Sequence, residues 1–342
     1  MLKPSARPSL KNIAEEAGVS VSLVSKVLND RLGNTGVTEA LAEKIRKTAR
    51  DLDYRKNLSA ESLRTGRHNA IGVLIHRHGE AGSGLTGNVM LGIAESAREH
   101  NQKLILNFFE KDEEFIEMSQ TAHRGMMDGL IIGGALHPDL KDQIFEIQKR
   151  GLPVVTVFDN PIHPDILNVG MNQSTAMEMI TRHLLDQGCR SVGTLSAHPQ
   201  RTQGFLKAMK DRGISVDPKW VQDPGELKYT YQAGEAAVKN WLATDSLPEG
   251  IAGQSDAHAM GIINSLNAAG IKVPEEVKVT GFDNAPFCEY ARPAITSVSQ
   301  AHEQRGKRTM ELVLDLSKGK KAVNEEALPQ LILRGSSGSV KV

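Results

Sequence analysis

The chain has 342 residues, of which 39% are hydrophobic and 24% charged, as is typical of a globular protein. This length exceeds what one hydrophobic core usually supports, so we expect two or three domains. No apolar run approaches the roughly 20 residues that cross a bilayer, and the N-terminal residues contain no signal-peptide core, which predicts a cytoplasmic protein with no membrane partner. The two cysteines, Cys189 and Cys288, are too few for a disulfide framework or a metal cluster, and we expect neither a metal nor a cofactor.

The net charge of zero conceals an uneven distribution. Residues 1–67 contain 13 Lys/Arg and 8 Asp/Glu, whereas the rest of the chain contains 28 and 33. A basic N-terminal segment on an acidic body indicates an anionic partner at one end of the chain.

Two short helices are predicted in the stretch SLKNIAEEAGVSVSLVSKVLND. Apolar residues recur there at helical spacing, at Ile13, Ala14, Ala17, Val24, Val27 and Leu28. Gly18 suits a left-handed turn between the helices, Ser20 is a favourable N-cap, and a third helix starts at Thr38. This is the helix-turn-helix arrangement, whose second helix enters the DNA major groove. The alternative is a three-helix bundle without a DNA-binding role.

This segment, with Tyr54 after its third helix, resembles the headpiece of the LacI family of bacterial repressors, which bind pseudo-palindromic operator DNA as dimers. The resemblance implies two groups of DNA-binding residues. Base edges would be contacted by Val21, Ser22 and Lys26, with the valine against a thymine methyl group and the lysine on a guanine. Phosphates would be contacted mainly by Ser20, Ser25 and Asn29.

The stretch NLSAESLRTGR, from Asn57 to Arg67, carries helix-forming residues but is too short for a stable isolated helix. In the LacI family this segment is a hinge helix that orders on operator DNA, where a leucine wedges between base steps of the minor groove. Leu63 matches that leucine, with Ala60 and Asn57 beside it; alternatively, Leu63 packs on the headpiece. The chain departs from the family by lacking a proline before Asn57 and by placing Glu61 beside the phosphates.

From Ala70 onward, apolar runs alternate with helical patterns. Strands are predicted at 70–75, 103–108, 129–133, 153–157, 191–195, 250–253 and 277–281, with helices between them, for instance at 88–100, 138–150, 174–187 and 256–269. Such alternation predicts parallel sheets of the doubly wound type, here in two α/β lobes. Ligands bind such sheets at the carboxyl ends of the strands, which would face a cleft between the lobes.

Signatures of enzymes are absent from the sequence. There is no G-x-S-x-G, P-loop or H-E-x-x-H motif, and the G-x-G-x-x-G of residues 82–87 follows its strand too late for a dinucleotide site. His76 and His78 flank Arg77 but have no neighbouring ligands in sequence, so they fit a cleft-lining role better than a metal site. We expect that the protein is not an enzyme.

The body also resembles the family's effector domain, which is similar to periplasmic sugar-binding proteins, in the segments MDGLII, GLPVVTVFDNP, RTQGF, GQSDAHAMG, VPEEVKVTGFDNAP and PAITSVSQ. Carboxylates and a guanidinium around a cleft suit a polyhydroxylated ligand. The residues expected to bind the effector are His76, Arg77, Asp159, Arg201, Tyr229, Ser255, Asp283 and Gln300. Three alternatives accompany them: Asp256 serves as a helix N-cap, Asp283 serves as a turn residue, and Arg201 pairs with Asp283 in the empty protein.

The resemblance thus implies an α/β protein with an all-α helix-turn-helix headpiece at residues 1–56 and a hinge helix and linker at 57–68. The effector domain would follow at 69–342, with an N-lobe at about 69–168 and 300–328 and a C-lobe at about 169–299 and 329–342. The predicted function is a homodimeric repressor whose operator affinity is controlled by a small effector, most simply a sugar or sugar derivative. The alternatives are a purine acting as corepressor, a carbohydrate-binding transport protein and a sugar-modifying enzyme.

Overall fold

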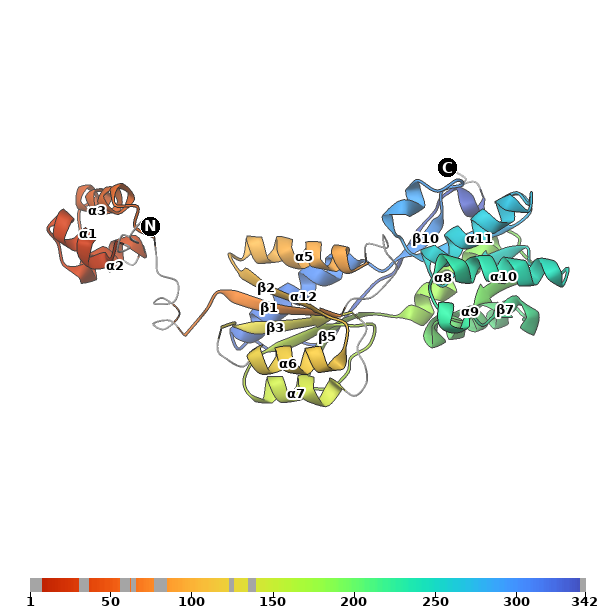
Figure 1. Ribbon diagram of the computed structural model, residues 1–342, viewed down its shortest axis with the longest axis horizontal. Helices are drawn as coiled ribbons and strands as arrows, with labels where there is room; N and C mark the ends of the chain where they lie inside the picture. The colour runs from red at the N-terminus through yellow and green to blue at the C-terminus, as the bar shows by residue number, and fades with distance from the viewer. Residues whose placement is uncertain are drawn as a thin grey trace, which may run out of the picture. The chain divides into compact units, whose positions relative to one another are not determined.

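The computed structural model describes residues 8–30, 37–55, 62, 66–76, 85–122, 126–134 and 140–338. The chain divides into two compact units, Met1–His68 and Asn69–Val342. Within them, the helical headpiece and the two parallel-sheet lobes confirm the predicted fold class (Figure 1). No helix in the described ranges is long and apolar enough to cross a membrane.

The first unit contains helices α1 (Leu10–Ala17), α2 (Val21–Leu28) and α3 (Glu39–Asp51). Ser9, Ser20 and Thr38 cap the three N-termini through their side chains, and Gly18 adopts the left-handed conformation, with φ of 71°, that the turn after α1 requires. The helices enclose a small core of Ile13, Ala14, Ala17, Val24, Val27, Ala42, Ile45 and Ala49. The predicted turn at Gly18 and the predicted cap at Ser20 are therefore present, and the third helix begins directly after Thr38. Of the predicted apolar positions in the first two helices, Leu28 is only partly buried and packs against the core.

The N-lobe of the second unit is a six-stranded sheet in the order β11-β5-β4-β3-β1-β2. Its strands are β1 (Ala70–His76), β2 (Lys103–Phe109), β3 (Gly129–Gly133), β4 (Val154–Val157), β5 (Leu167–Met171) and β11 (Glu325–Ala327). All neighbouring pairs run parallel. Helices α5 (Leu85–Glu99) and α12 (His302–Ser317) pack on one face of the sheet, and α6 (Asp112–Ala122) and α7 (Lys141–Lys149) on the other.

The C-lobe repeats this plan in the order β12-β10-β9-β8-β6-β7. Its strands are β6 (Val192–Leu195), β7 (Val221–Gln222), β8 (Gly250–Ala252), β9 (Lys278–Asp283), β10 (Thr296–Ser299) and the antiparallel β12 (Gln330–Ile332). Helices α8 (Gln173–Asp186) and α9 (Pro199–Asp211) cover one face, and α10 (Tyr231–Ala243) and α11 (Asp256–Ala268) the other. Short 3-10 turns occupy Pro218–Trp220, Gly225–Leu227, Pro286–Glu289 and Gly335–Ser337.

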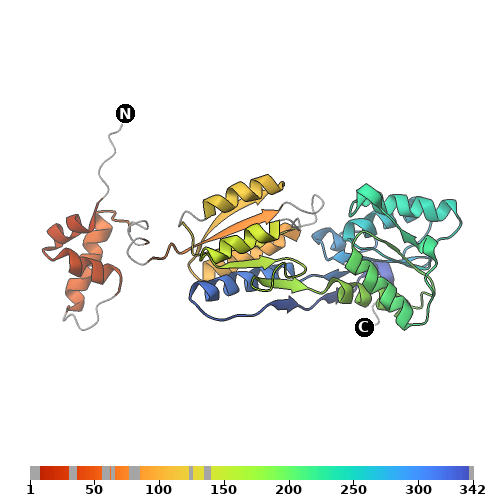
Figure 2. The same ribbon diagram turned by 90° about the horizontal axis from the view of Figure 1, so that it is seen from below.

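The chain passes between the lobes after β5, after β10 and between β11 and β12. Figure 2 shows the last passage in dark blue, running from the N-lobe sheet to the C-lobe sheet. Because β5 extends to Met171, the first passage lies slightly later than the predicted position 168. The seven predicted strands are present, whereas β5, β7, β10, β11 and β12 had no separate prediction because they are short or only partly apolar.

Candidate functional site

A cavity of about 280 Å³ lies between the lobes of the second unit. It is bounded by residues that follow the carboxyl ends of strands in both sheets, including Gly134, Asp159, His198, Ser255, Asp283 and Gln300. This is the position that parallel α/β sheets use for ligands. The volume is close to the lower end of the range for small-molecule pockets, roughly 300–1,000 Å³, so the cavity suits a small ligand.

Arg201 is the central side chain of the site. It projects from the first turn of α9, its guanidinium stacks 3.7 Å from the ring centroid of Phe282, and only 6% of its surface is exposed. Its Nε donates a hydrogen bond to Gln173 Oε1 (2.8 Å), and its Nη1 donates to the backbone oxygen of Gln254. Its Nη2 lies 3.6 Å from Asp283 Oδ1, so the predicted pairing of Arg201 with Asp283 is present.

Two glutamines connect this cluster with the N-lobe. Gln173 Nε2 donates to Asp159 Oδ1 (2.9 Å) and to Gln300 Oε1 (3.0 Å), and Gln300 Nε2 donates to Asp283 Oδ1. Gln173 follows the first passage between the lobes, and Gln300 lies in the second. The hydrogen-bond network therefore joins both lobes through two of the segments that connect them.

Ser255, and not Asp256, is the N-cap of α11, so the alternative role predicted for Asp256 is wrong. The Ser255 hydroxyl accepts a hydrogen bond from the His258 amide (3.0 Å) and donates to the Tyr229 carbonyl (3.3 Å), which leaves it little capacity for a ligand. Asp256 instead accepts hydrogen bonds from the Ala285 amide and the Ser297 hydroxyl, both at 2.6 Å. A buried carboxylate thus anchors the segment that follows β9.

The three carboxyl groups of the cavity differ in their electrostatics. Burial, with a further contribution from the neighbouring Asp283, raises the pKa of Asp256 to about 7. Burial also raises the pKa of Asp283, against the opposing effect of the Arg201 charge. For Asp159, burial acts upward, but hydrogen bonding to His198 and the charges of Arg201 and Arg305 outweigh it and lower the pKa to about 2. Of the three, Asp159 therefore loses its proton at the lowest pH.

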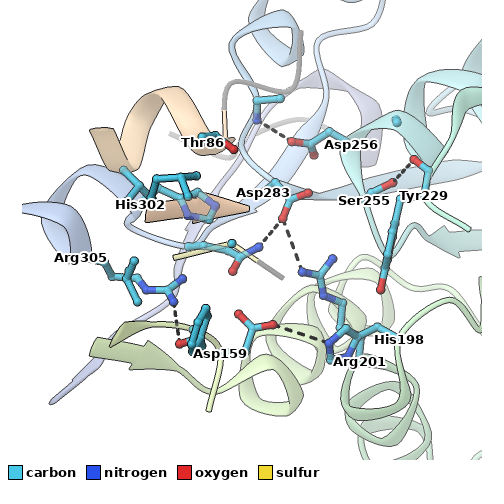
Figure 3. A pocket seen from close by; sticks show the side chains of 18 of the residues that line it. Thr86, Asp159, His198, Arg201, Tyr229, Ser255, Asp256, Asp283, His302 and Arg305 are labelled. Atoms are coloured by element: carbon cyan, nitrogen blue, oxygen red, sulfur yellow. Dashed lines mark hydrogen bonds and ion pairs between the residues drawn. The ribbon is translucent and has the colours of Figure 1, made fainter. Parts of the chain in front are cut away.

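The N-lobe wall of the cavity carries polar side chains that had no sequence-based prediction. Thr86 lies in the first turn of α5, and His302 and Arg305 lie in the first turn of α12 (Figure 3). The Arg305 side chain donates to the carbonyls of Val169 (3.2 Å) and Phe158 (2.9 Å). The helical pattern of residues 302–317 could have indicated His302 and Arg305 in the sequence. A helix that follows a passage between the lobes begins at the cleft, so the residues of its first turn lie there.

The structure brings six of the eight predicted effector residues together around the cavity: Asp159, Arg201, Tyr229, Ser255, Asp283 and Gln300. His76 is not among the described lining residues. Its ring packs edge-on against Phe109 at the end of β2, with centroids 5.2 Å apart. The prediction that it faces the effector is therefore not supported by its position. Arg77 and His78 lie outside the described residues. Within the described ranges, no group of three or more His, Cys, Asp or Glu side chains could hold a metal ion.

The predicted DNA-binding residues occupy one surface of the headpiece. Ser20, Ser22 and Lys26 are exposed, and the apolar Val21 is 43% exposed although the opposite face of α2 is buried. Ser25 and Asn29 lie close together, with Asn29 Nδ2 donating to the Ser25 carbonyl (2.6 Å). Asn57, Ala60 and Leu63 lie outside the described residues.

Comparison with known proteins connects both units with one family. Residues 9–57 match the bacterial regulatory proteins of the lacI family, and residues 181–337 match a periplasmic binding protein-like domain. The HTH-type transcriptional repressor PurR of Photobacterium profundum is 27% identical over 342 residues, covering 96% of this chain and 98% of that protein. The repressor CytR of Escherichia coli (strain K12) is 24% identical over 347 residues, covering 98% of each chain.

A lac repressor dimer bound to operator and the anti-inducer ONPF has the same fold, with a TM-score of 0.81 at 19% identity over 98% of this chain and 100% of that chain.

The raised pKa of Asp256 predicts a pH-dependent stability of the C-lobe. Protonated Asp256 contributes stability that is present below about pH 4, near the pKa of an exposed aspartate, and is lost as the pH rises through about 7. The stability of an Asp256→Asn variant relative to the wild type should therefore increase from pH 5 to pH 8. Urea unfolding followed by tryptophan fluorescence measures this, because both tryptophans of the chain, Trp220 and Trp241, pack in the C-lobe. Exposed Asp245→Asn is the control, and an equal pH response in both variants would contradict the prediction.

Proposed function

Because the chain belongs to the LacI family of bacterial regulatory proteins, we propose that it is a transcriptional repressor that binds operator DNA as a homodimer under the control of a small effector. It acts by binding, not by catalysis. The observation that carries the proposal is the surface of α2, where an apolar residue, two serines and a lysine face outward from a core that needs none of them. Such a mixture suits base edges, which present a methyl group on thymine and acceptors on guanine.

The effector would bind in the cavity around Arg201. Asp159, Asp283 and Arg201 supply acceptors and donors at fixed positions, and Tyr229 supplies an aromatic face; a polyhydroxylated ring can use both. These features support a sugar or sugar derivative. A purine acting as corepressor is the second candidate, because Phe158, Tyr229 and Phe287 also line the cavity with flat apolar surface.

Control of DNA binding would follow from the network at the lobe passages. A ligand that contacts Arg201 and Asp283 competes with their bonds to Gln173 and Gln300, so it changes the relative stability of the open and closed arrangements of the lobes. A ligand with different affinities for two arrangements shifts the population between them. We propose that residues 57–68 form the hinge that transmits this shift to the headpiece.

The dimer would use the free edge of the N-lobe sheet. Strand β2 ends the strand order, and its Leu106 and Phe108, on the same face of the strand, are 41% and 45% exposed. Leu91 on the neighbouring α5 is 56% exposed. Exposed apolar residues on an edge strand favour association, and a second copy of the chain supplies an identical apolar surface.

Replacing Lys26 by alanine should weaken binding to the selected operator by about 1–3 kcal/mol and relax its sequence preference, because a base contact is lost. The operator is first selected from a random DNA pool, and binding is then followed by fluorescence anisotropy at several salt concentrations. Lys11→Ala is the control, since Lys11 is an exposed lysine of α1 beside Glu15. Equal losses in both variants would contradict base recognition by α2, and binding without salt dependence would contradict the DNA-binding function.

A Phe108→Asp variant should be monomeric, or dimerise much more weakly than the wild type, because a charge on each copy would meet the same charge across a twofold interface. Light scattering coupled to size-exclusion chromatography gives the mass. Leu206→Asp on α9 introduces the same charge at an exposed apolar position away from β2 and should leave the dimer intact. A stable Phe108→Asp dimer would place the interface elsewhere.

An effector at about 100 times its dissociation constant stabilises the folded protein by roughly 2.7 kcal/mol, which raises the melting temperature by a few degrees. A thermal-shift screen should yield a carbohydrate whose effect is lost in Arg201→Lys, since lysine cannot reproduce the bidentate guanidinium. Arg212→Lys, exposed at the end of α9, is the control. A shift from purines alone would replace the sugar by a purine and leave the repressor function in place.

A further inference from the structure

The two walls of the cavity differ in chemistry. The C-lobe wall contributes the carboxyl groups of Asp256 and Asp283. On the N-lobe side, which also carries the carboxylate of Asp159 after β4, Figure 3 shows Thr86, His302 and Arg305 gathered together. The helices that carry these three residues lie in tight contact. A Cβ atom at Gly306 of α12 would clash with the Val89 carbonyl of α5, so glycine is required for the two helix N-termini to reach the cavity together.

Arg305 is a buried cation without a carboxylate partner among the described residues. It is 3% exposed, and its side chain donates to two neutral backbone carbonyls, those of Val169 and Phe158. These bonds use two of its five N–H groups, which leaves three donors on a side chain that lines the cavity. Burial lowers the pKa of Arg305, and the charge of Asp159 acts in the opposite direction from beyond ion-pair distance. A buried charge that is only partly compensated favours a further anion.

His302 adds a second nitrogen without a hydrogen-bond partner among the described residues to the same wall. It is the first residue of α12, a helix with no side-chain cap, and its Nε2 atom is buried without a hydrogen-bond partner among the described residues. Burial lowers the pKa of His302 to about 3, so the ring is neutral at neutral pH and can donate one hydrogen bond. An uncapped helix N-terminus has unpaired amides and a partial positive charge, which also favour an anion.

We propose that an anionic group of the effector, a carboxylate or a phosphate, binds to Arg305 and His302, while its hydroxyl groups face Arg201 and Asp283. This inference rests on the proposed carbohydrate effector and specifies its class as a sugar acid or a sugar phosphate. The arrangement also gives the ligand a direction, with its charged end on the N-lobe and its neutral end on the C-lobe. Both lobes then contact one molecule, which is what closure of the cleft around a ligand requires.

The alternative role for Arg305 is structural, because its side chain links the middle of β5, at the Val169 carbonyl, with the residue after β4, at the Phe158 carbonyl. That role affects stability but not the choice between charged and neutral ligands. The difference in affinity between a neutral sugar and its charged derivative is therefore the measurement that separates the two roles.

The experiment is isothermal titration calorimetry of the full chain with matched probes: glucose, gluconate and glucose 6-phosphate, the corresponding galactose and mannose series, and inorganic phosphate. In the wild type, at least one acid or phosphate should bind about ten- to a hundredfold tighter than its neutral sugar. Arg305→Met should remove this preference while leaving the neutral sugar within about threefold, and His302→Phe should reduce it. Arg308→Met is the matched control, because Arg308 lies one turn further along α12, pairs with Glu325 and does not line the cavity.

The preference for carboxylates over phosphates, or the reverse, identifies which anion the wall accepts. A neutral sugar that binds at least as tightly as its charged derivatives, or a preference that persists in Arg305→Met, would overturn the anionic subsite and leave the carbohydrate effector in place. Failure of every carbohydrate, neutral or charged, would overturn the carbohydrate effector itself. If Arg305→Met does not fold, as shown by circular dichroism, His302→Phe decides the outcome by the same comparison.

Discussion

The second unit depends on the burial of one positive charge at the junction of its lobes. The guanidinium of Arg201 is removed from water, and a buried charge is strongly destabilising unless it is paired and hydrogen-bonded. Its partners come from different parts of the chain: Gln173 after β5, Gln254 after β8 and Asp283 at the end of β9. They meet only when both the C-lobe sheet and the passage from the N-lobe are correctly formed.

The same constraint determines what the cavity can accept. The polar groups around Arg201 are already bonded to one another, so a ligand that reaches them has to replace those bonds with others of comparable strength or leave buried groups unsatisfied. The backbone of Asp283 has a φ of 111°, a region that residues other than glycine rarely adopt. The carboxyl group of Asp283 is thus positioned at the cost of local backbone strain. An apolar ligand of the right size would disrupt the network without compensating it, and this favours a ligand rich in hydrogen-bonding groups.

The headpiece is stabilised by different means. Its described core consists of eight small or medium aliphatic residues, and side-chain caps on all three helices satisfy amides that so small a core cannot shield. The core of the headpiece therefore accounts for the apolar residues on the buried face of α2, Val24 and Val27, and places no such demand on its outer face. Val21, at the start of α2, lies on that outer face and is 43% exposed.

The sequence by itself determined the elements whose signals are local. The Gly18 turn, the Ser20 cap, the helix start at Thr38 and the apolar strands such as 70–75 and 129–133 follow from backbone conformation, side-chain capping and hydrophobic pattern, all of which act over a few residues. The family motifs also indicated Arg201, Asp159 and Asp283, because each lies at a recognisable strand or helix end. Strand β11 was not predicted, since EEA has neither alternation nor apolar character and forms a strand only because β5 provides its parallel partner.

Only the tertiary structure decided how those residues are used. It made Ser255 the cap and Asp256 the buried anchor, although they are neighbours in sequence, because the Ala285 amide and the Ser297 hydroxyl approach the carboxylate from distant strand ends. It placed His302 and Arg305 in the cavity wall and turned His76 toward Phe109. Burial and charge at a site are sums over groups that are far apart in the chain, so no short stretch of sequence contains them, whereas caps, turns and periodic apolar faces are complete within one.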